Sequence, residues 1–313
     1  MRFGSLLLSA LLLLAMPLAA QEKKSTFGPI GDHVVAGPAK NVDIITPHIT
    51  DSHELELPFV GELQLPRWAP VHIGGLEIDL SPTKHVIMLL LAALLCLGIM
   101  IPAAMSNQRQ TAHTGHAKGF AGAVESLVLF IRNEVVLPNV GHHGDAYVPF
   151  AMTLFFFILF ANLLGLVPYG STATGNISVT ATLAILAFFV IEFAGMKALG
   201  RNYWRTIIYW PSDQHLAIKL PMTFIMTPIE IIGKFTKPFA LAIRLFANMT
   251  AGHVVLLALI SLIFTFGSFY VAVAPIAMGV AISMLELFVA LLQAYIFTLL
   301  ASVFIGLIRE SAH

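Results

Sequence analysis

The stretch KPFALAIRLFANMTAGH, residues 237–253, places an arginine inside an apolar segment that runs from 220 to 266. Arg244 lies seven residues after Lys237 and nine before His253. A charged side chain at the centre of a membrane helix costs ~2.5–3.5 kcal/mol on insertion scales, and such residues usually mark ion pathways or counter-ions. Arg244 therefore predicts a function inside a membrane. The structural alternative is an arginine that snorkels or forms a salt bridge between helices.

The composition is that of a membrane protein. The chain has 313 residues, of which 58% are hydrophobic and 11% charged, whereas soluble domains are about 45–50% apolar and about 25% charged. The 17 basic and 17 acidic residues balance, so nothing indicates a nucleic-acid partner. The single cysteine, Cys96, excludes an internal disulfide, and we expect it to pack as a small apolar residue.

The N-terminal part of the chain is expected to lie outside the cytoplasm. Residues 1–20, MRFGSLLLSALLLLAMPLAA, have the pattern of a secretory signal peptide, with an uncleaved membrane anchor as the alternative. Residues 21–83 are a polar extracytoplasmic extension without catalytic spacing. Within them HELELPFV (53–60) and VHIGGLEIDL (71–80) alternate apolar and polar residues, which predicts a small sheet or hairpin.

Residues 84–313 are expected to form an all-α polytopic membrane domain with about five crossings. The predicted spans are 84–105, 147–167, 177–196 and the long stretches 220–266 and 275–308, and the polar loop 106–146 contains an amphipathic piece, AVESLVLFIRNEVVLP. Lys and Arg gather in the loops 106–146 and 197–219 and are absent from 168–176 and 267–274. The positive-inside rule then places the N-terminus outside and the C-terminus in the cytoplasm of a bacterial inner membrane.

The last two apolar stretches are too long to stand upright in a bilayer. About 20 residues cross ~30 Å of hydrocarbon, but straight helices over 220–266 and 275–308 would reach roughly 70 and 50 Å. Three prolines, Pro221, Pro228 and Pro238, could bend the first, although strong tilt is the simpler account. We therefore expect a long, steeply inclined antiparallel helical hairpin, with its turn near GSFYVAVA (267–274).

This hairpin predicts which polar residues meet. A turn centred near residue 270 places His253 opposite Glu286, and Arg244 opposite the neighbourhood of Gln293 and Tyr295. The pair of His253 and Glu286 is either a satisfied buried pair or a proton relay. A two-ligand metal site lacks a third His or Cys, so no metal is expected.

Helical phase sorts the same residues into two faces. At ~100° per residue, Arg244 shares a face with Asn248, and Glu230 falls within about 40° of it. Glu286 and Gln293 share a face of their own helix, while His253 points away from Arg244. The arginine can therefore face one environment while the His253–Glu286 pair lines another.

The chain shows no means of hydrolysing a substrate and is not expected to be an enzyme by itself. It has no phosphate-binding loop of the GxxxxGK[ST] type, no nucleophile elbow and no paired cysteines, and no cofactor is expected. HHGDAY (142–147) and HTGH (113–116) could bind metal but are more simply solvated loops. A self-contained secondary transporter is the rival class, but no internal repeat supports it. A structural scaffold would leave the aligned polar residues unexplained.

These segments resemble subunit a of F-type ATP synthase over roughly residues 84–310. KPFALAIRLFANMTAGH resembles the arginine signature of that family, LLQAYIFTLLASVFIGL (291–307) its final helix, and FFFILFANLLGLVP (155–168) its asparagine-containing span. The resemblance implies a stator subunit that offers two proton half-channels to a rotating c-ring, with ATP chemistry in partner subunits. The implied partners are the c-ring, b-type peripheral-stalk subunits, the remaining complex and membrane lipid.

The resemblance also implies a role for each residue. Arg244 would face the c-ring carboxylate and seal the two half-channels from each other. Asn248, Gln293 and Asn162 would line the outer half-channel, and Glu230 would belong to the cytoplasmic one.

Two departures from the family pattern stand out. Many bacterial members carry Glu at the position of His253 and His at the position of Glu286, so the pair is exchanged here. Gly165 and Gly170 stand where some relatives have acidic groups, so the resemblance does not assign the lining of the outer part of the access path.

Overall fold

The computed structural model describes residues 50–57, 61–73, 76–79, 81–114, 119–141, 144–167, 172–208, 210, 215–266 and 269–310. The expected signal peptide, the first part of the extension, Gly170 and the histidines of HHGDAY lie outside the described residues, as do the last two residues of HTGH.

In the described part of the chain, five helices are long and apolar enough to cross a membrane, in agreement with the predicted number of crossings. They are α3 (Lys84–Thr114), α6 (Val148–Gly165), α7 (Ile177–Leu199), α8 (Leu216–Phe266) and α9 (Phe269–Glu310). Helix α3 extends beyond the expected span 84–105 and continues to Thr114. The polar residues after 105 end the hydrophobic stretch, but several of them are good helix formers and extend the same helix.

The amphipathic piece between the first two spans is helical. It forms α4 (Gly119–Phe130), a π-helical turn η1 (Ile131–Val136) and α5 (Leu137–Val140). Ile131, Val135 and Val136 are fully buried, so the apolar side of this piece packs into the core. Short 3₁₀ segments follow at η2 (Gly144–Ala146), η3 (Ala173–Gly175) and η4 (Gly200–Thr206).

The described part of the extension forms two β-hairpins. β1 (Glu54–Leu57) pairs antiparallel with β2 (Gly61–Gln64), and β3 (Val71–Ile73) pairs antiparallel with β4 (Leu76–Ile78). The two predicted pieces therefore do not pair with each other, since each strand finds a partner only a few residues away. The extension joins the membrane domain where the Lys84 amide donates to the Ser52 carbonyl at 3.0 Å.

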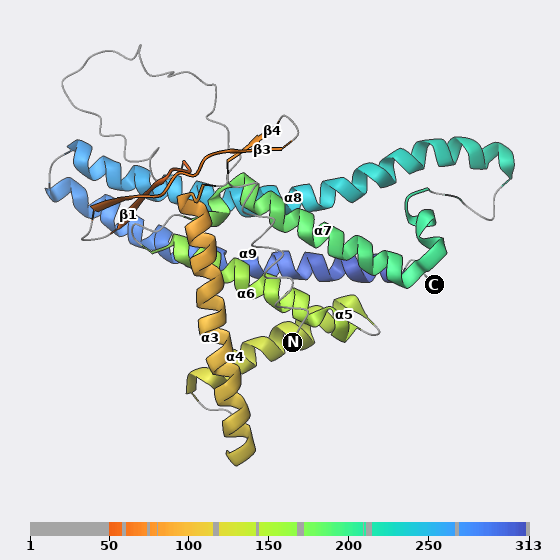
Figure 1. Cartoon of the computed structure of the whole chain (residues 1–313), viewed down its shortest axis with the longest axis horizontal. Helices are drawn as coiled ribbons and strands as arrows, with labels where there is room; N and C mark the ends of the chain where they lie inside the picture. Colours follow the sequence, from red (N-terminus) through yellow and green to blue (C-terminus); the bar gives the residue numbers. More distant parts are fainter. Residues whose placement is uncertain are drawn as a thin grey trace, which may run out of the picture.

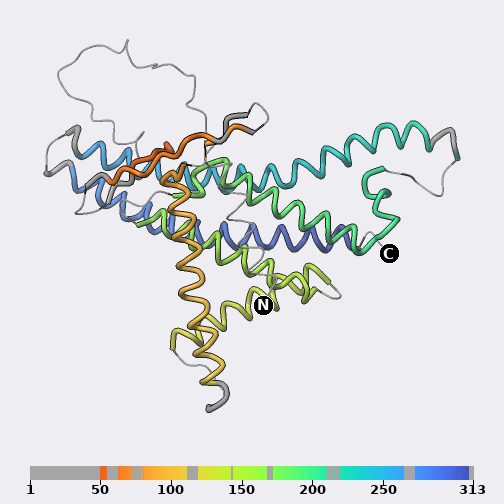
Figure 2. The backbone as a smooth tube through the Cα atoms, in the orientation of Figure 1, coloured from red at the N-terminus to blue at the C-terminus, as the bar shows by residue number. Residues whose placement is uncertain are grey.

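The long hairpin is present, and α8 and α9 run side by side (Figure 1). All three prolines of α8 lie inside the helix without ending it. The expected turn is displaced, because α9 already begins at Phe269 and contains Pro275. A proline early in a helix removes a single hydrogen bond, so the apolar residues before it remain helical. Figure 2 shows the hairpin lying across the direction of α3, as a steeply inclined pair would lie beside an upright span.

Helix α6 lies in the core, whereas α8 is the least covered of the five helices. Of the most apolar window in each helix, 61% is buried in α6 and only 11% in α8. The exposed large side chains of α8 include Phe224, Ile225, Ile229, Ile232, Phe235, Phe239 and Ile243. An apolar face of this extent is covered by lipid or by another protein in the native setting.

Candidate functional site

Arg244 lies on the uncovered face of α8. Its side chain and that of Asn248 are exposed, whereas the adjacent Leu245 is 1% exposed and packs inward. The Arg244 carbonyl accepts a hydrogen bond from Gln293 Nε2 at 3.2 Å. Within the described ranges, no carboxylate forms an ion pair with the Arg244 guanidinium. The alternative of a structural salt bridge therefore finds no support in this part of the chain.

His253 and Glu286 meet as the hairpin register predicts. His253 Nδ1 lies 4.0 Å from Glu286 Oε1, and the two side chains are 19% and 8% exposed. Glu286 Oε1 is buried without a hydrogen-bond partner among the described residues. The predicted pairing of α8 with α9 is therefore correct although α9 begins earlier than expected. The hydrogen bond between Gln293 and Arg244 confirms this pairing at a second position.

Asn162 is connected to this pair through Thr172 and Thr174, which precede α7. The Asn162 side chain is fully buried; its Nδ2 donates to the Ala290 carbonyl at 3.2 Å, and its Oδ1 accepts from Thr174 Oγ1 at 2.7 Å. Thr172 Oγ1 lies 3.4 Å from His253 Nδ1. Asn162, Thr172, Thr174, His253 and Glu286 thus form one polar group, which we call the outer cluster.

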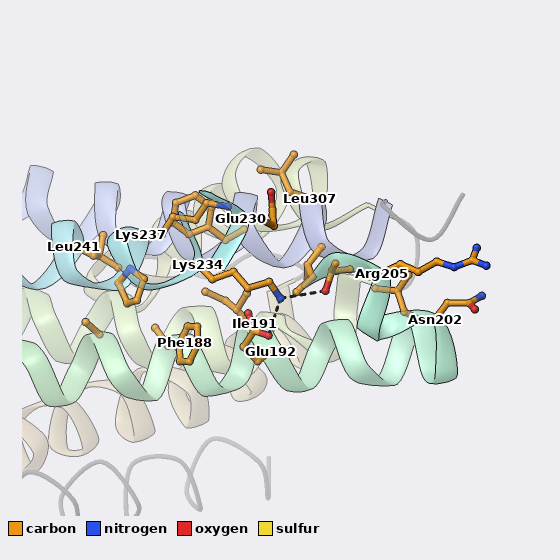
Figure 3. A pocket seen from close by; sticks show the side chains of 17 residues that line it. Phe188, Ile191, Glu192, Asn202, Arg205, Glu230, Lys234, Lys237, Leu241 and Leu307 are labelled. Atoms are coloured by element: carbon orange, nitrogen blue, oxygen red, sulfur yellow. Dashed lines mark hydrogen bonds and ion pairs between the residues drawn. The ribbon is translucent and has the colours of Figure 1, made fainter. Parts of the chain in front are cut away.

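Glu230 lies elsewhere, in a pocket of about 620 Å³ toward the other end of α8. The pocket is lined by α7, η4, α8 and the end of α9, and Figure 3 shows its charged side chains. Lys234 Nζ lies 3.2 Å from Glu192 Oε2 and donates to Thr206 Oγ1 at 3.1 Å. Glu230 itself is exposed and has no ion pair in the described part of the chain.

Glu192 is a polar residue of the pocket that was not predicted from the sequence. This acid lies inside an apolar span, so the rule that singled out Arg244 also applies to it. Thr172 and Thr174 were not predicted either, and no sequence signal marks them, because they matter only through their tertiary contacts with His253 and Asn162.

The pocket around Glu230, Arg244 and the outer cluster follow one another in this order along α8. At ~1.5 Å per residue, Glu230 lies roughly 21 Å from Arg244, and His253 lies roughly 13 Å beyond it. Arg244 thus separates the pocket around Glu230 from the outer cluster. The structure brings Asn162, His253 and Glu286 together, with Gln293 on the same helix as Glu286, and leaves Arg244 and Asn248 on the exposed face.

A family model described as ATP synthase A chain matches residues 86–306. The chain belongs to this family. It is 47% identical over 267 residues to ATP synthase subunit a 2 of Chlorobaculum tepidum, which covers 85% of this chain and 72% of that protein. It is 45% identical over 260 residues to ATP synthase subunit a of Chloroherpeton thalassium, with coverage of 83% and 74%.

Family membership and the five apolar helices together identify a multi-pass membrane protein of the ATP synthase subunit a family. The resemblance inferred from the arginine segment is confirmed. The matched range begins at Val86, so the described β-hairpins and the first two residues of α3 precede it.

Proposed function

We propose that this chain is the stator subunit of the membrane sector of an F-type ATP synthase, where it couples proton flow to rotation of a c-ring. One observation carries the proposal. The exposed Arg244 has no acidic partner in the described part of its own chain and lies between two separate polar regions. A guanidinium in an apolar setting needs an anion, and a carboxylate on a neighbouring subunit would supply it.

The outer cluster is the proposed outer half-channel. A proton passes Asn162 and the pair of His253 and Glu286, and neutralises a carboxylate on the ring. The orphaned Glu286 Oε1 is a position where water would bind within such a path. Asn248 and Gln293 flank the point of transfer next to Arg244.

The pocket around Glu230 is the proposed cytoplasmic half-channel. It combines a volume that holds water with Glu230, Glu192 and Lys234. A ring carboxyl that reaches this pocket loses its proton, and Arg244 attracts the ionised group and blocks direct leakage between the half-channels. The driving energy is ~2.3 kcal/mol per charge per 100 mV, plus the pH gradient.

The proposed orientation follows from the loop charges. The outer cluster lies where α6 ends and α7 begins, next to the loop 168–176 that lacks Lys and Arg. The pocket around Glu230 lies next to the basic segment 197–219. The positive-inside rule thus assigns the first to the outside and the second to the cytoplasm of a bacterial inner membrane. The partners are the c-ring, the peripheral stalk and the remaining complex, and the ATP chemistry belongs to those subunits.

The test is Arg244→Lys in the complete complex, assayed by ATP-driven acidification of inverted membrane vesicles. Lysine keeps the charge but loses the planar fork of donors, so we expect pumping to fall at least about tenfold, the effect of ~1.4 kcal/mol. Arg132→Lys is the matched control, because Arg132 is paired with Asp145 at 2.7 Å on the surface. Normal pumping by the Arg244 variant would refute the role. If the purified chain transports ions without a ring of small subunits, the result would support a secondary transporter instead.

A further inference from the structure

A second buried acid–imidazole pair connects the extension with the first span. His85 Nδ1 lies 2.9 Å from Asp51 Oδ1, and the two side chains are only 3% and 6% exposed. Asp51 precedes β1, and His85 is the second residue of α3. Both residues lie outside the range 86–306 that the family model matches. Nothing in the proposed path from Asn162 to Glu230 uses this pair.

Within the described part of the chain, two buried polar atoms at this pair lack the hydrogen bonds that a purely structural contact would provide. Asp51 Oδ1 accepts from the Ser52 amide at 3.1 Å and lies 3.4 Å from the His85 amide. The other oxygen, Asp51 Oδ2, and the neighbouring Thr83 Oγ1 are buried without a hydrogen-bond partner among the described residues. Two buried polar atoms of this kind are the atoms that an internal water molecule binds.

The short segment 172–176 links this pair to the outer cluster. Three of its residues, Thr172, Thr174 and Asn176, are 5%, 0% and 3% exposed. Asn176 Nδ2 lies 3.5 Å from His85 Nδ1, at one end of the segment. Thr172 Oγ1 lies 3.4 Å from His253 Nδ1, at the other end. One buried polar segment therefore contacts the imidazoles of both acid–histidine pairs.

The segment 172–176 packs closely against α6 because residue 165 is a glycine. A Cβ at position 165 would overlap Thr172 Oγ1 and approach the rest of that side chain. The absence of a side chain on α6 at this point thus allows the Thr172 hydroxyl to lie between α6 and His253.

We propose that Asp51 and His85 form the mouth of the outer half-channel, where protons from the outer solvent are collected and passed along residues 172–176 to His253 and Glu286. The inference rests on the proposed function and deepens it. The pair takes up one proton from the outer water. It then releases one proton to water beside Asn176 and returns to its starting state. Asp51 and His85 act on the transferred proton, and Thr172 and Asn176 position its path.

The charges around the pair suit this role. Burial raises the pKa of Asp51, but the hydrogen bond and charge of His85 outweigh it, so the pKa is lowered from its ordinary value. The Asp51 carboxylate is therefore ionised at neutral pH. Ionisable groups near it among the described residues include Lys84, which precedes His85, and His53, whose Nδ1 lies 3.2 Å from the Pro82 carbonyl. Asp79, which accepts from the Ser81 amide at 2.9 Å, interacts electrostatically with His53. From α7 the neighbouring side chain, Asn176, is uncharged.

The experiment uses the complete complex in liposomes, with ATP synthesis driven by an acid–base jump and a potassium–valinomycin potential. Asp51→Asn keeps the shape of the side chain and removes its charge. We expect the rate per assembled complex to fall about tenfold, less than the 10²–10⁴-fold typical of a positioned proton-transfer group because water supplies a bypass. The dependence of the rate on outer pH should also change, since the pair has lost its ionised carboxylate.

Three further variants make the result decisive. Asp51→Glu should restore most of the rate and the original pH profile. Glu54→Gln, at an exposed acid three residues away, should leave both unchanged. Arg244→Lys, measured in parallel, tests the proposed function by itself: if it is inactive while Asp51→Asn synthesises ATP at the normal rate and pH profile, only this inference fails. A loss of assembled complex in Asp51→Asn with an unchanged rate per complex would show a structural role and would also overturn it.

Discussion

Single atoms decide the geometry of the outer cluster, and Gly252 shows this most clearly. A Cβ at position 252 would overlap Glu286 Oε1 and crowd the carboxyl carbon at 2.9 Å. Gly252→Ala should therefore push the Glu286 carboxyl away from His253, although alanine by itself favours a helix by about 0.5–1 kcal/mol over glycine. We expect ATP-driven pumping to fall severalfold without loss of the subunit from the membrane.

The control for this change is Gly98→Ala, in the apolar part of α3, where an added Cβ meets nothing within 4 Å. It should leave pumping unchanged. Equal loss of pumping in both variants would show that the effect comes from helix backbone changes and not from Glu286.

The titration of Asp51 makes a separate prediction at this scale. Because the pKa of Asp51 is lowered from 3.8, its ionised form stabilises the folded state above that value, and this contribution is lost as the pH falls through the lower, folded pKa. The attachment of the β-hairpins to α3 should thus be constant from neutral pH down to about 4 and weaken below it. Limited proteolysis of residues 50–83 across this range would measure it, and loosening near neutral pH would contradict it.

At the scale of elements, helix packing depends on a close approach between α9 and α5. A Cβ at Gly306 would overlap the Asn139 carbonyl oxygen, and Arg309 Nη1 donates to the Val140 carbonyl at 3.0 Å. Gly306→Ala forces two backbones apart, and overpacking of this kind costs about 1–3 kcal/mol. We expect a lower melting temperature of the purified complex and less subunit in the membrane. Gly279→Ala, on the same helix with nothing within 4 Å of its added Cβ, should melt normally.

The elements and the main contacts of the site could be predicted because they depend on local rules. Hydropathy determined the five spans, and hairpin register placed His253 against Glu286. The last apolar stretch was predicted to start at 275, whereas α9 begins at Phe269 and contains Pro275. The pairing of Asp51 with His85 joins residues 34 positions apart, and neither periodicity nor spacing specifies such a contact.

At the scale of the whole molecule, the uncovered face of α8 is where we expect the proposed c-ring to dock. We expect Ala247→Cys, on the exposed side beside Arg244, to form a disulfide with a cysteine placed on the outer helix of a c subunit. The single native cysteine, Cys96, is buried and would be replaced by alanine. Leu245→Cys, at a position that is 1% exposed, is the control and should not cross-link. Cross-linking from position 245 alone would place the ring on another face.

The crossing of the α8–α9 hairpin over α3, drawn in Figure 1, has a mechanical consequence. With α3 upright, α8 runs more sideways than upward, so Glu230 and His253, which both lie on α8, are offset sideways. In the proposed function, the two half-channels are then offset sideways as well as opening to opposite sides of the membrane, so a proton that leaves one can reach the other only on a carrier that moves sideways. If the proposed function holds, the direction in which these two helices lie is what converts a voltage across the membrane into torque.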